Sequence, residues 1–396
     1  MKKIFTSICL FVVFITFANA QQISLSESTK FSLLTCGPGP LAYEKFGHTA
    51  IRVFDESQDL DVIANWGIFN FDQPGFYVKF VRGYTYYMLG IHETSYFLEG
   101  YRIRNSSVTE QVLNLTQDEK QRLLDAILVN YRPENREYLY NFVFDNCATR
   151  PHELLVRVIK PKRVELTNGI EPKTFRDWVR EYTGKHSWLQ FGIDLVFGKD
   201  ADKIATPLHA MFLPEVLYRE YKDAKIIDES AERIPLVSAE SILVKAKNEP
   251  KEITFYPLPF ITTLLLFIVG ILITYFENKK KKHYRAFDVV LFSLTGIAGL
   301  IIFYLAVFSI HPLVKSNYNL LWCNPLNLLA VVFIFVKKAD SVLKRYLEGY
   351  FILLAFSFVI AVLKIQVLNI AFLPIIALLL VRALYQLKVG KKIQTK

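Results

Sequence analysis

A histidine and a cysteine, far apart in the chain, have surroundings that suit nucleophilic catalysis. His48 lies in the segment 47–53 (GHTAIRV), which predicts a strand that follows a glycine. Cys147 lies in the segment 145–150 (DNCATR), which predicts the start of a helix with Asp145 or Asn146 near its N-cap. A helix N-terminus favours thiolate over thiol, and thiol chemistry needs a base nearby. We therefore expect Cys147 to be a nucleophile and His48 its base.

A third polar group is needed to orient such a base. Asn65, in the segment 62–67 (VIANWG), lies on the strand expected after that of His48. Neighbouring antiparallel strands place side chains of one face about 5 Å apart, so Asn65 is our prediction for this role. Asp61 and Asn70 compete with it, because the pattern does not reveal the register. Alternatively, His48 and Cys147 are structural, with Cys147 in a disulfide.

Residues beside these motifs are candidates for binding a substrate. Arg150 follows Cys147 by one helical turn, where it would contact a phosphate or an oxyanion, or form a surface salt bridge instead. Tyr43 precedes the histidine motif and is expected to line the same cleft, and Asn146 adjoins the nucleophile. The chain has no zinc-ligand spacing, phosphate-binding glycine loop or nucleic-acid motif. We expect no metal, no cofactor and no nucleic-acid partner.

The N-terminus has the pattern of a secretory signal peptide. Lys2 and Lys3 precede an apolar stretch that ends in the cleavage pattern Ala-Asn-Ala at 18–20. We expect a signal peptide over 1–20 and an exported catalytic domain over 21–250. Its only cysteines are Cys36 and Cys147, which would be the partners in the alternative disulfide.

The exported domain mixes strand and helix patterns. The segments 51–54 and 61–71 predict strands, whereas 115–130, 148–159 and 175–182 predict helices, so the fold is α+β. Thr116 is the expected N-cap of the first helix. The apolar stretches at 192–198 and 209–217 are expected to be core, or else a lid or a surface that rests on a membrane.

The C-terminal third predicts a membrane domain. Hydrophobic residues make up 52% of the chain, which is too many for a purely soluble protein. Basic clusters follow the first, third and fifth apolar segments, which places these ends and the tail at 388–396 in the cytoplasm. We expect an all-α domain over 257–387, with five spans at about 257–276, 289–310, 319–336, 349–366 and 369–387.

Several polar residues fall at membrane depth. Polar groups there are costly and usually serve a purpose. His311, Trp322 and Asn324 lie near the outer ends of the second and third segments, where we expect a lipid-headgroup or substrate entry site. Helix packing is the alternative explanation. Arg382 is expected to extend its charged end to the cytoplasmic face.

These motifs resemble known families. The order of a His-x-Ala-Ile-x-Val strand and a later Asn-Cys is similar to circularly permuted papain-like enzymes, including lecithin:retinol acyltransferase. A longer resemblance, to the Bacteroidota-type lipoprotein N-acyltransferases (Lnb-like), also rests on GPG at 37–39, FGHTAIRV at 46–53, NWG at 65–67, PENR at 133–136 and DNCATR at 145–150. That family has a periplasmic domain followed by membrane spans.

The resemblance implies an inner-membrane enzyme with a periplasmic active site. Cys147 would take an acyl chain from a membrane phospholipid as a thioester, and would pass it to the N-terminal amine of a diacylated lipoprotein. The partners are then the phospholipid, the lipoprotein and the lipid bilayer. Two alternatives stay open, namely a papain-like cell-wall peptidase or other lipid thiol hydrolase, and a non-catalytic membrane scaffold.

Overall fold

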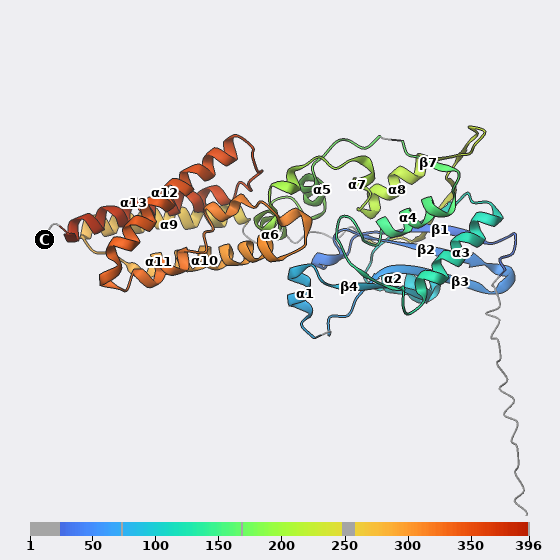
Figure 1. Ribbon diagram of the computed structural model, residues 1–396, viewed down its shortest axis with the longest axis horizontal. Helices are drawn as coiled ribbons and strands as arrows, with labels where there is room; N and C mark the ends of the chain where they lie inside the picture. Colours follow the sequence, from blue (N-terminus) through green and yellow to red (C-terminus); the bar gives the residue numbers. More distant parts are fainter. Residues whose placement is uncertain (1–23, 73, 168, 248–257, 395–396) are drawn as a thin grey trace, which may run out of the picture.

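The computed structural model describes residues 24–394 apart from 73, 168 and 248–257. The predicted signal peptide at 1–20 lies outside the described residues. A sheet-rich N-terminal domain is followed by a helical C-terminal region, and the two meet where helices α1, α6 and α10 come together (Figure 1).

A seven-stranded antiparallel sheet forms the centre of the N-terminal domain, in the order β10-β5-β1-β2-β3-β4-β6. Neighbouring residues on a strand face opposite sides, so Leu33 packs into one buried cluster and Leu34 into the other. The strands are β1 (Lys30–Cys36), β2 (His48–Asp55), β3 (Leu60–Ile68), β4 (Tyr86–Glu93), β5 (Val108–Leu113), β6 (Glu137–Leu139) and β10 (Val237–Val244).

Helices cover both faces of this sheet. Side chains of α2 (Thr94–Ile103) pack on one face, and those of α3 (Gln117–Tyr131), α4 (Thr149–Val158) and α8 (Pro214–Asp223) pack on the other. The other elements are α1 (Phe76–Arg82), α5 (Phe175–Tyr182), α6 (Trp188–Val196), α7 (Pro207–Ala210), the short sheet of β7 (Arg163–Glu165), β8 (Lys225–Ile227) and β9 (Arg233–Pro235), and the 3-10 turns η1 (Ala42–Glu44), η2 (Glu56–Gln58) and η3 (Lys199–Asp202).

Local sequence signals account for the helices that position the site. Thr116 caps α3, because its hydroxyl accepts from the amide of Glu119 and the Glu119 carboxylate accepts from the Thr116 amide. The predicted helices at 115–130, 148–159 and 175–182 are confirmed as α3, α4 and α5. The stretch at 209–217 is mainly buried core.

The C-terminal region contains four long helices. Among the described residues, three are long and apolar enough to cross a membrane, namely α9, α10 and α12. Helix α13 packs against α9 and α12, beside which it runs in Figure 1. The helices are α9 (Pro259–Lys280), α10 (Arg285–Phe308), α11 (Asn327–Phe333), α12 (Asp340–Val362) and α13 (Phe372–Gln394), with the 3-10 turns η4 (Pro312–Val314), η5 (Tyr318–Leu321) and η6 (Lys337–Ala339).

The third predicted span, 319–336, is not one continuous helix. It contains the end of η5 and the seven-residue helix α11, which is about 10 Å long at 1.5 Å per residue. Pro325 has no amide hydrogen, and the Asn324 side chain accepts from the Leu326 amide, which starts a new helix there. A sequence window counts such a segment as a span because it averages hydropathy and ignores the break.

Arg382 does not extend to a membrane face as we expected. It is fully buried, and its guanidinium donates to the carboxylates of Glu277 and Asp288. His283 bonds the second of these carboxylates. A charge without partners is costly at this depth, so these bonds join α9, α10 and α13 at one end of the helical region.

Asp194 joins the two parts of the chain. This carboxylate on α6 is 1% exposed and accepts hydrogen bonds from Arg176, Arg180 and Asn369. Asn319, in η5, donates to the carbonyl of Asp194 itself. Phe191 and Leu195 pack on the buried cluster of the helical region, whereas Ile193 and Phe197 pack on that of the sheet domain, so the stretch at 192–198 lies between the two parts. This buried network fixes the sheet domain on the ends of the helices.

Candidate active site

His48 is the first residue of β2, and a tight turn determines its position. The preceding residue, Gly47, has a φ of 73°, and a Cβ there would lie 2.7 Å from the carbonyl oxygen of Cys36. Only glycine allows the chain to approach β1 so closely in this conformation. The register then pairs His48 with Cys36 at the end of the strands.

Asn65 on β3 holds the imidazole ring. The Nε2 atom of His48 lies 2.5 Å from Oδ1 of Asn65. Because a carbonyl oxygen only accepts, Nε2 carries the proton and donates, and Nδ1 is left for Cys147. The structure thus brings His48, Asn65 and Cys147 together, with a hydrogen bond between His48 and Cys147. The competitor Asp61 is bonded to Arg52 instead.

Cys147 directly precedes Ala148, the N-cap residue of α4, and the side chain of Asn146 binds the first amides of this turn. The Asn146 side chain accepts from the amides of Ala148 and Thr149 and donates to the carbonyls of Phe142 and Phe212. It is 3% exposed. The side-chain groups of Asn146 are all bonded within the protein, so Asn146 positions the turn that carries Cys147, and its contact with a substrate stays a prediction.

The surroundings favour a separated pair of charges. Burial raises the pKa of the Cys147 thiol, but the charge of His48, its hydrogen bond and the amides of Thr49 and Cys147 lower that pKa below its ordinary value. Burial lowers the pKa of His48, whereas Cys147 and the hydrogen bond from Asn65 raise it above its ordinary value. Both shifts favour the state in which Cys147 is a thiolate and His48 an imidazolium.

Two backbone groups at the site were not predicted from the sequence. The amide of Thr49 donates to the sulfur of Cys147. Gly67 has a φ of 101°, and a Cβ there would lie 3.5 Å from Cε1 of His48 and 3.6 Å from Cβ of Cys147. A glycine leaves open the space beside both side chains. The NWG motif contained this signal, because a glycine inside a strand often marks a bulge or a close approach, and the pairing of β3 with β4 shifts between Trp66 and Ile68.

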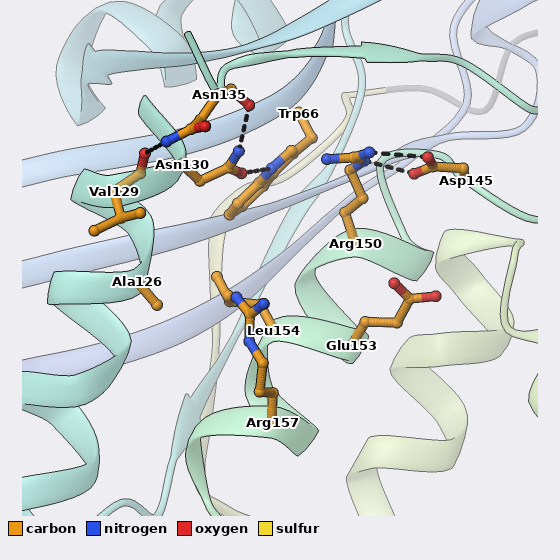
Figure 2. Close-up of a pocket in the computed structure, with 10 residues that line it drawn as sticks. All are labelled: Trp66, Ala126, Val129, Asn130, Asn135, Asp145, Arg150, Glu153, Leu154 and Arg157. Carbon is orange, nitrogen blue, oxygen red and sulfur yellow. Dashed lines mark hydrogen bonds and ion pairs between the residues drawn. The ribbon is translucent and has the colours of Figure 1, made fainter. Parts of the chain in front are cut away.

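Arg150 lies beside the site but is already engaged. Its guanidinium makes two bonds to Asp145, one of them 2.8 Å from Nη2 to Oδ2, and it stacks 3.6 Å from the ring centre of Tyr138. It lines a pocket of about 550 Å³ whose wall includes Trp66 and Arg157 (Figure 2). The pair of Arg150 and Asp145 thus contributes charged groups to the wall of this pocket, and Cys147 is not among the residues that line it.

Tyr43 is part of an aromatic cluster near the site. Its ring is 57% exposed and lies 6.1 Å from the ring of Phe69 and 6.1 Å from that of Phe71, measured between centroids. Phe69 in turn stacks on Tyr87 at 4.7 Å. Two members of the cluster, Phe69 and Phe71, follow Gly67 closely along the chain, so the cluster extends away from Cys147.

The three predicted residues in the helical region do not meet Cys147. Trp322 is 2% exposed, and its indole donates to Asn319 within the core of the helices. Asn324 caps the turn before α11. His311 donates from Nε2 to the carbonyl of Phe80 on α1. Trp322 and Asn324 thus take part in helix packing and in a turn, and the lipid-headgroup site at these three residues stays a prediction.

The alternative disulfide is not formed. Within the described part of the chain, Cys36, Cys147 and Cys323 are free thiols. Cys36 is buried beneath the site, and burial raises its pKa to about 12. The surroundings thus raise the pKa of the Cys36 thiol and lower that of the Cys147 thiol.

Comparison with models of protein families shows which family this chain belongs to. The Lnb N-terminal periplasmic domain matches residues 16–181, and the Lnb transmembrane domain matches residues 249–393. This chain is an Lnb-like protein. Searches among curated proteins and solved structures gave no match. The Lnb-like chain is thus a membrane protein whose N-terminal part is periplasmic, and the expected resemblance to this family is confirmed.

The two thiols of the Lnb-like domain should differ in reactivity. We expect iodoacetamide at pH 7 to modify Cys147 and to leave Cys36 unmodified, because only Cys147 has a lowered pKa and a partly exposed sulfur-bearing side chain. Peptide mapping by mass spectrometry on the full-length protein in detergent measures both. The substitution His48→Ala should slow the modification of Cys147 by about tenfold or more, because each unit of pKa changes the thiolate fraction about tenfold.

His92→Ala is the matched control, since His92 is another partly exposed strand histidine and lies on β4. It should leave the labelling of Cys147 unchanged. Equal labelling of Cys36 and Cys147, or a His48→Ala protein that reacts as fast as wild type, would contradict this account of the site.

Proposed function

We propose that this Lnb-like protein is a lipoprotein N-acyltransferase in the bacterial inner membrane. Cys147 is the nucleophile, His48 the base and Asn65 the residue that orients the base. The observation that carries the proposal is the position of the Cys147 thiol beside His48, whose ring Asn65 holds by a hydrogen bond. Its setting, on a periplasmic domain attached to membrane helices, supports a membrane-anchored substrate.

The first half of the reaction acylates the enzyme. The Cys147 thiolate attacks the carbonyl carbon of a phospholipid ester, and the carbon–oxygen bond of that ester breaks. The protonated His48 gives its proton to the departing alkoxide, so a lysophospholipid leaves and an acyl thioester stays on Cys147.

The second half transfers the acyl chain. The free α-amine of a diacylated lipoprotein attacks the thioester carbonyl, and neutral His48 accepts a proton from that amine. The carbon–sulfur bond breaks, which forms an amide and returns Cys147 as thiolate beside protonated His48. The cycle closes without a metal or cofactor, and both protein groups end as they began.

Both proposed substrates are anchored in the same membrane as the enzyme. The buried bonds of Asp194 and the asparagines of η5 hold the sheet domain against the ends of α10 and α13. A site fixed at this level meets lipid-anchored groups at high effective concentration. This geometry supports transfer between membrane substrates better than cleavage of a soluble peptide.

The architecture that accompanies this proposal is a circularly permuted papain-like domain on five membrane crossings. The strand of His48 precedes the helix of Cys147, and an asparagine orients the histidine, as in that superfamily. The crossings are α9, α10, the broken segment around α11, α12 and α13, which leaves the C-terminus in the cytoplasm. Arg150, at the rim of its pocket, is our candidate for a phosphate contact.

The lipoproteins of cells that lack the Cys147 thiol should test the proposal. In cells whose only N-acyltransferase is this chain, we expect N-acylated lipoprotein cysteines with wild type and free amines with Cys147→Ala. Mass spectrometry of lipoprotein N-terminal peptides distinguishes the two. The Cys36→Ala variant, which removes the other thiol of the domain, should retain N-acylation.

Other outcomes would favour other functions. Identical N-termini in wild type and Cys147→Ala would refute acyl transfer to lipoproteins. Altered murein peptides in that variant would then point to a cell-wall peptidase, and accumulated free fatty acid to a lipid thiol hydrolase. If Cys147→Ala changes neither lipoproteins, murein peptides nor free fatty acid, the result would favour a non-catalytic membrane scaffold.

The role of Asn65 can be tested through the pH dependence of acyl transfer. Asn65 raises the pKa of His48, so Asn65→Ala should move the alkaline limb of the profile to lower pH, and Asn65→Asp should move it to higher pH. The acid limb, which reports the first proton lost by the pair, should stay in place. Loss of one hydrogen bond, about 1 kcal/mol, predicts a rate about fivefold lower in Asn65→Ala. An alkaline limb that stays at the wild-type pH in both variants would contradict the orienting role of Asn65.

A further inference from the structure

Helix α1 presents an unusual surface to its surroundings. Six of its seven residues are exposed, and only Phe76 is buried. The exposed side chains are mostly apolar, with Tyr77 at 74%, Val78 at 59% and Phe80 at 46%. A contiguous apolar surface of this kind usually marks a contact with a membrane or a partner.

The end of α1 is bonded directly to the end of the apolar helix α10. The amide of Ile310 donates to the carbonyl of Arg82 over 2.9 Å, and Nε2 of His311 lies 2.8 Å from the carbonyl oxygen of Phe80. Helix α10 is long and apolar enough to cross a membrane and ends at Phe308, two residues before these contacts. Helix α1 therefore lies where α10 leaves the bilayer (Figure 1).

The composition around α1 matches a membrane–water boundary. Lys79 and Arg82 are exposed on α1, and the exposed rings of Tyr84 and Tyr86 follow it. Tyrosine gathers at such boundaries because its ring is apolar and its hydroxyl is polar, and basic side chains there meet lipid phosphates. The charges thus favour a lipid surface over an apolar protein partner.

Aromatic rings connect α1 to the candidate active site. The ring of Phe76 lies 6.0 Å from that of Phe69, Phe69 lies 4.7 Å from Tyr87, and Tyr87 lies 4.1 Å from Tyr140, all between centroids. Phe69 follows closely after Gly67, whose missing side chain leaves space beside His48 and Cys147. Burial and the nearby charge of Cys147 raise the pKa values of Tyr87 and Tyr140, so the row of rings runs from α1 to the surroundings of the thiol.

We propose that α1 lies in the outer leaflet of the membrane that α10 crosses, and that the row of rings guides one acyl chain of a phospholipid to Cys147. The occupant of this surface is a phospholipid of the bilayer itself. The guidance to Cys147 rests on the proposed acyl transfer, whereas the position of α1 in the leaflet does not.

A photo-crosslinking residue tests the position of α1. Benzoylphenylalanine replaces Tyr77 in the full-length protein in phospholipid vesicles, and Tyr96 on α2 is the matched control. Tyr96 is 75% exposed, and its ring lies beside His92 on the sheet domain. Mass spectrometry of the irradiated protein should show a phospholipid adduct at position 77 and none at position 96.

Each other outcome has a clear meaning. Equal lipid adducts at both positions, none at position 77, or an adduct there with a second protein copy would overturn the proposal. A lipid adduct at position 77 in a protein that leaves lipoprotein amines free would refute the acyl transfer, but the position of α1 in the leaflet would stand.

Two glycines provide a second test of how α1 is held. Gly75 and Gly83 flank α1, and both have positive φ, so alanine strains either one. A Cβ at Gly83 would lie 2.7 Å from Cγ1 of Ile310, whereas a Cβ at Gly75 meets nothing within 4 Å. We expect Gly83→Ala to reduce the yield of lipid adduct at position 77 severalfold relative to Gly75→Ala. Equal yields would show that contact with α10 does not set the depth of α1.

Discussion

The interaction between Cys147 and His48 is the one on which the proposed chemistry depends. A thiolate in a partly buried site is unfavourable unless opposite charge and amide donors compensate its loss of water. The helix start at α4, the amide of Thr49 and the imidazolium supply that compensation. Asn65 keeps the imidazole in the one orientation that leaves Nδ1 for the sulfur. Strands β2 and β3 and the cap of α4 can each be understood as supports for this arrangement.

The sheet domain is also attached to the helical region through buried polar groups that have hydrogen-bond partners. Asp194 is buried and paired with Arg176 and Arg180 of its own domain, and Asn369 of the helical region donates to the same carboxylate. A tilt of the domain would break the bond from Asn369 at this buried charge. Helix α1 adds a second contact at the end of α10. Two separate contacts fix the height of Cys147 above the bilayer, which suits a reaction whose proposed partners are both lipid-anchored.

The sequence predicts what local chemistry determines and fails where distant segments meet. Thr116 predicts the start of α3, and the aspartate and asparagine before Cys147 predict the start of α4, because caps and periodicity are local signals. Asn65 was one of three candidates, and only the register of β2 with β3 selects it. The break in the predicted span 319–336 and the engagement of Arg150 by Asp145 depend on side-chain partners that hydropathy averages do not record.

The central claim is that Cys147 carries an acyl chain, and the intact mass of the protein tests it most directly. Full-length protein is incubated in vesicles of a single phospholipid without a lipoprotein acceptor. The account predicts an added mass equal to one acyl chain of that lipid, located on Cys147 and removed by neutral hydroxylamine, as a thioester is. An unmodified Cys147 whose thiolate reacts with iodoacetamide, or an adduct on another residue, would contradict it.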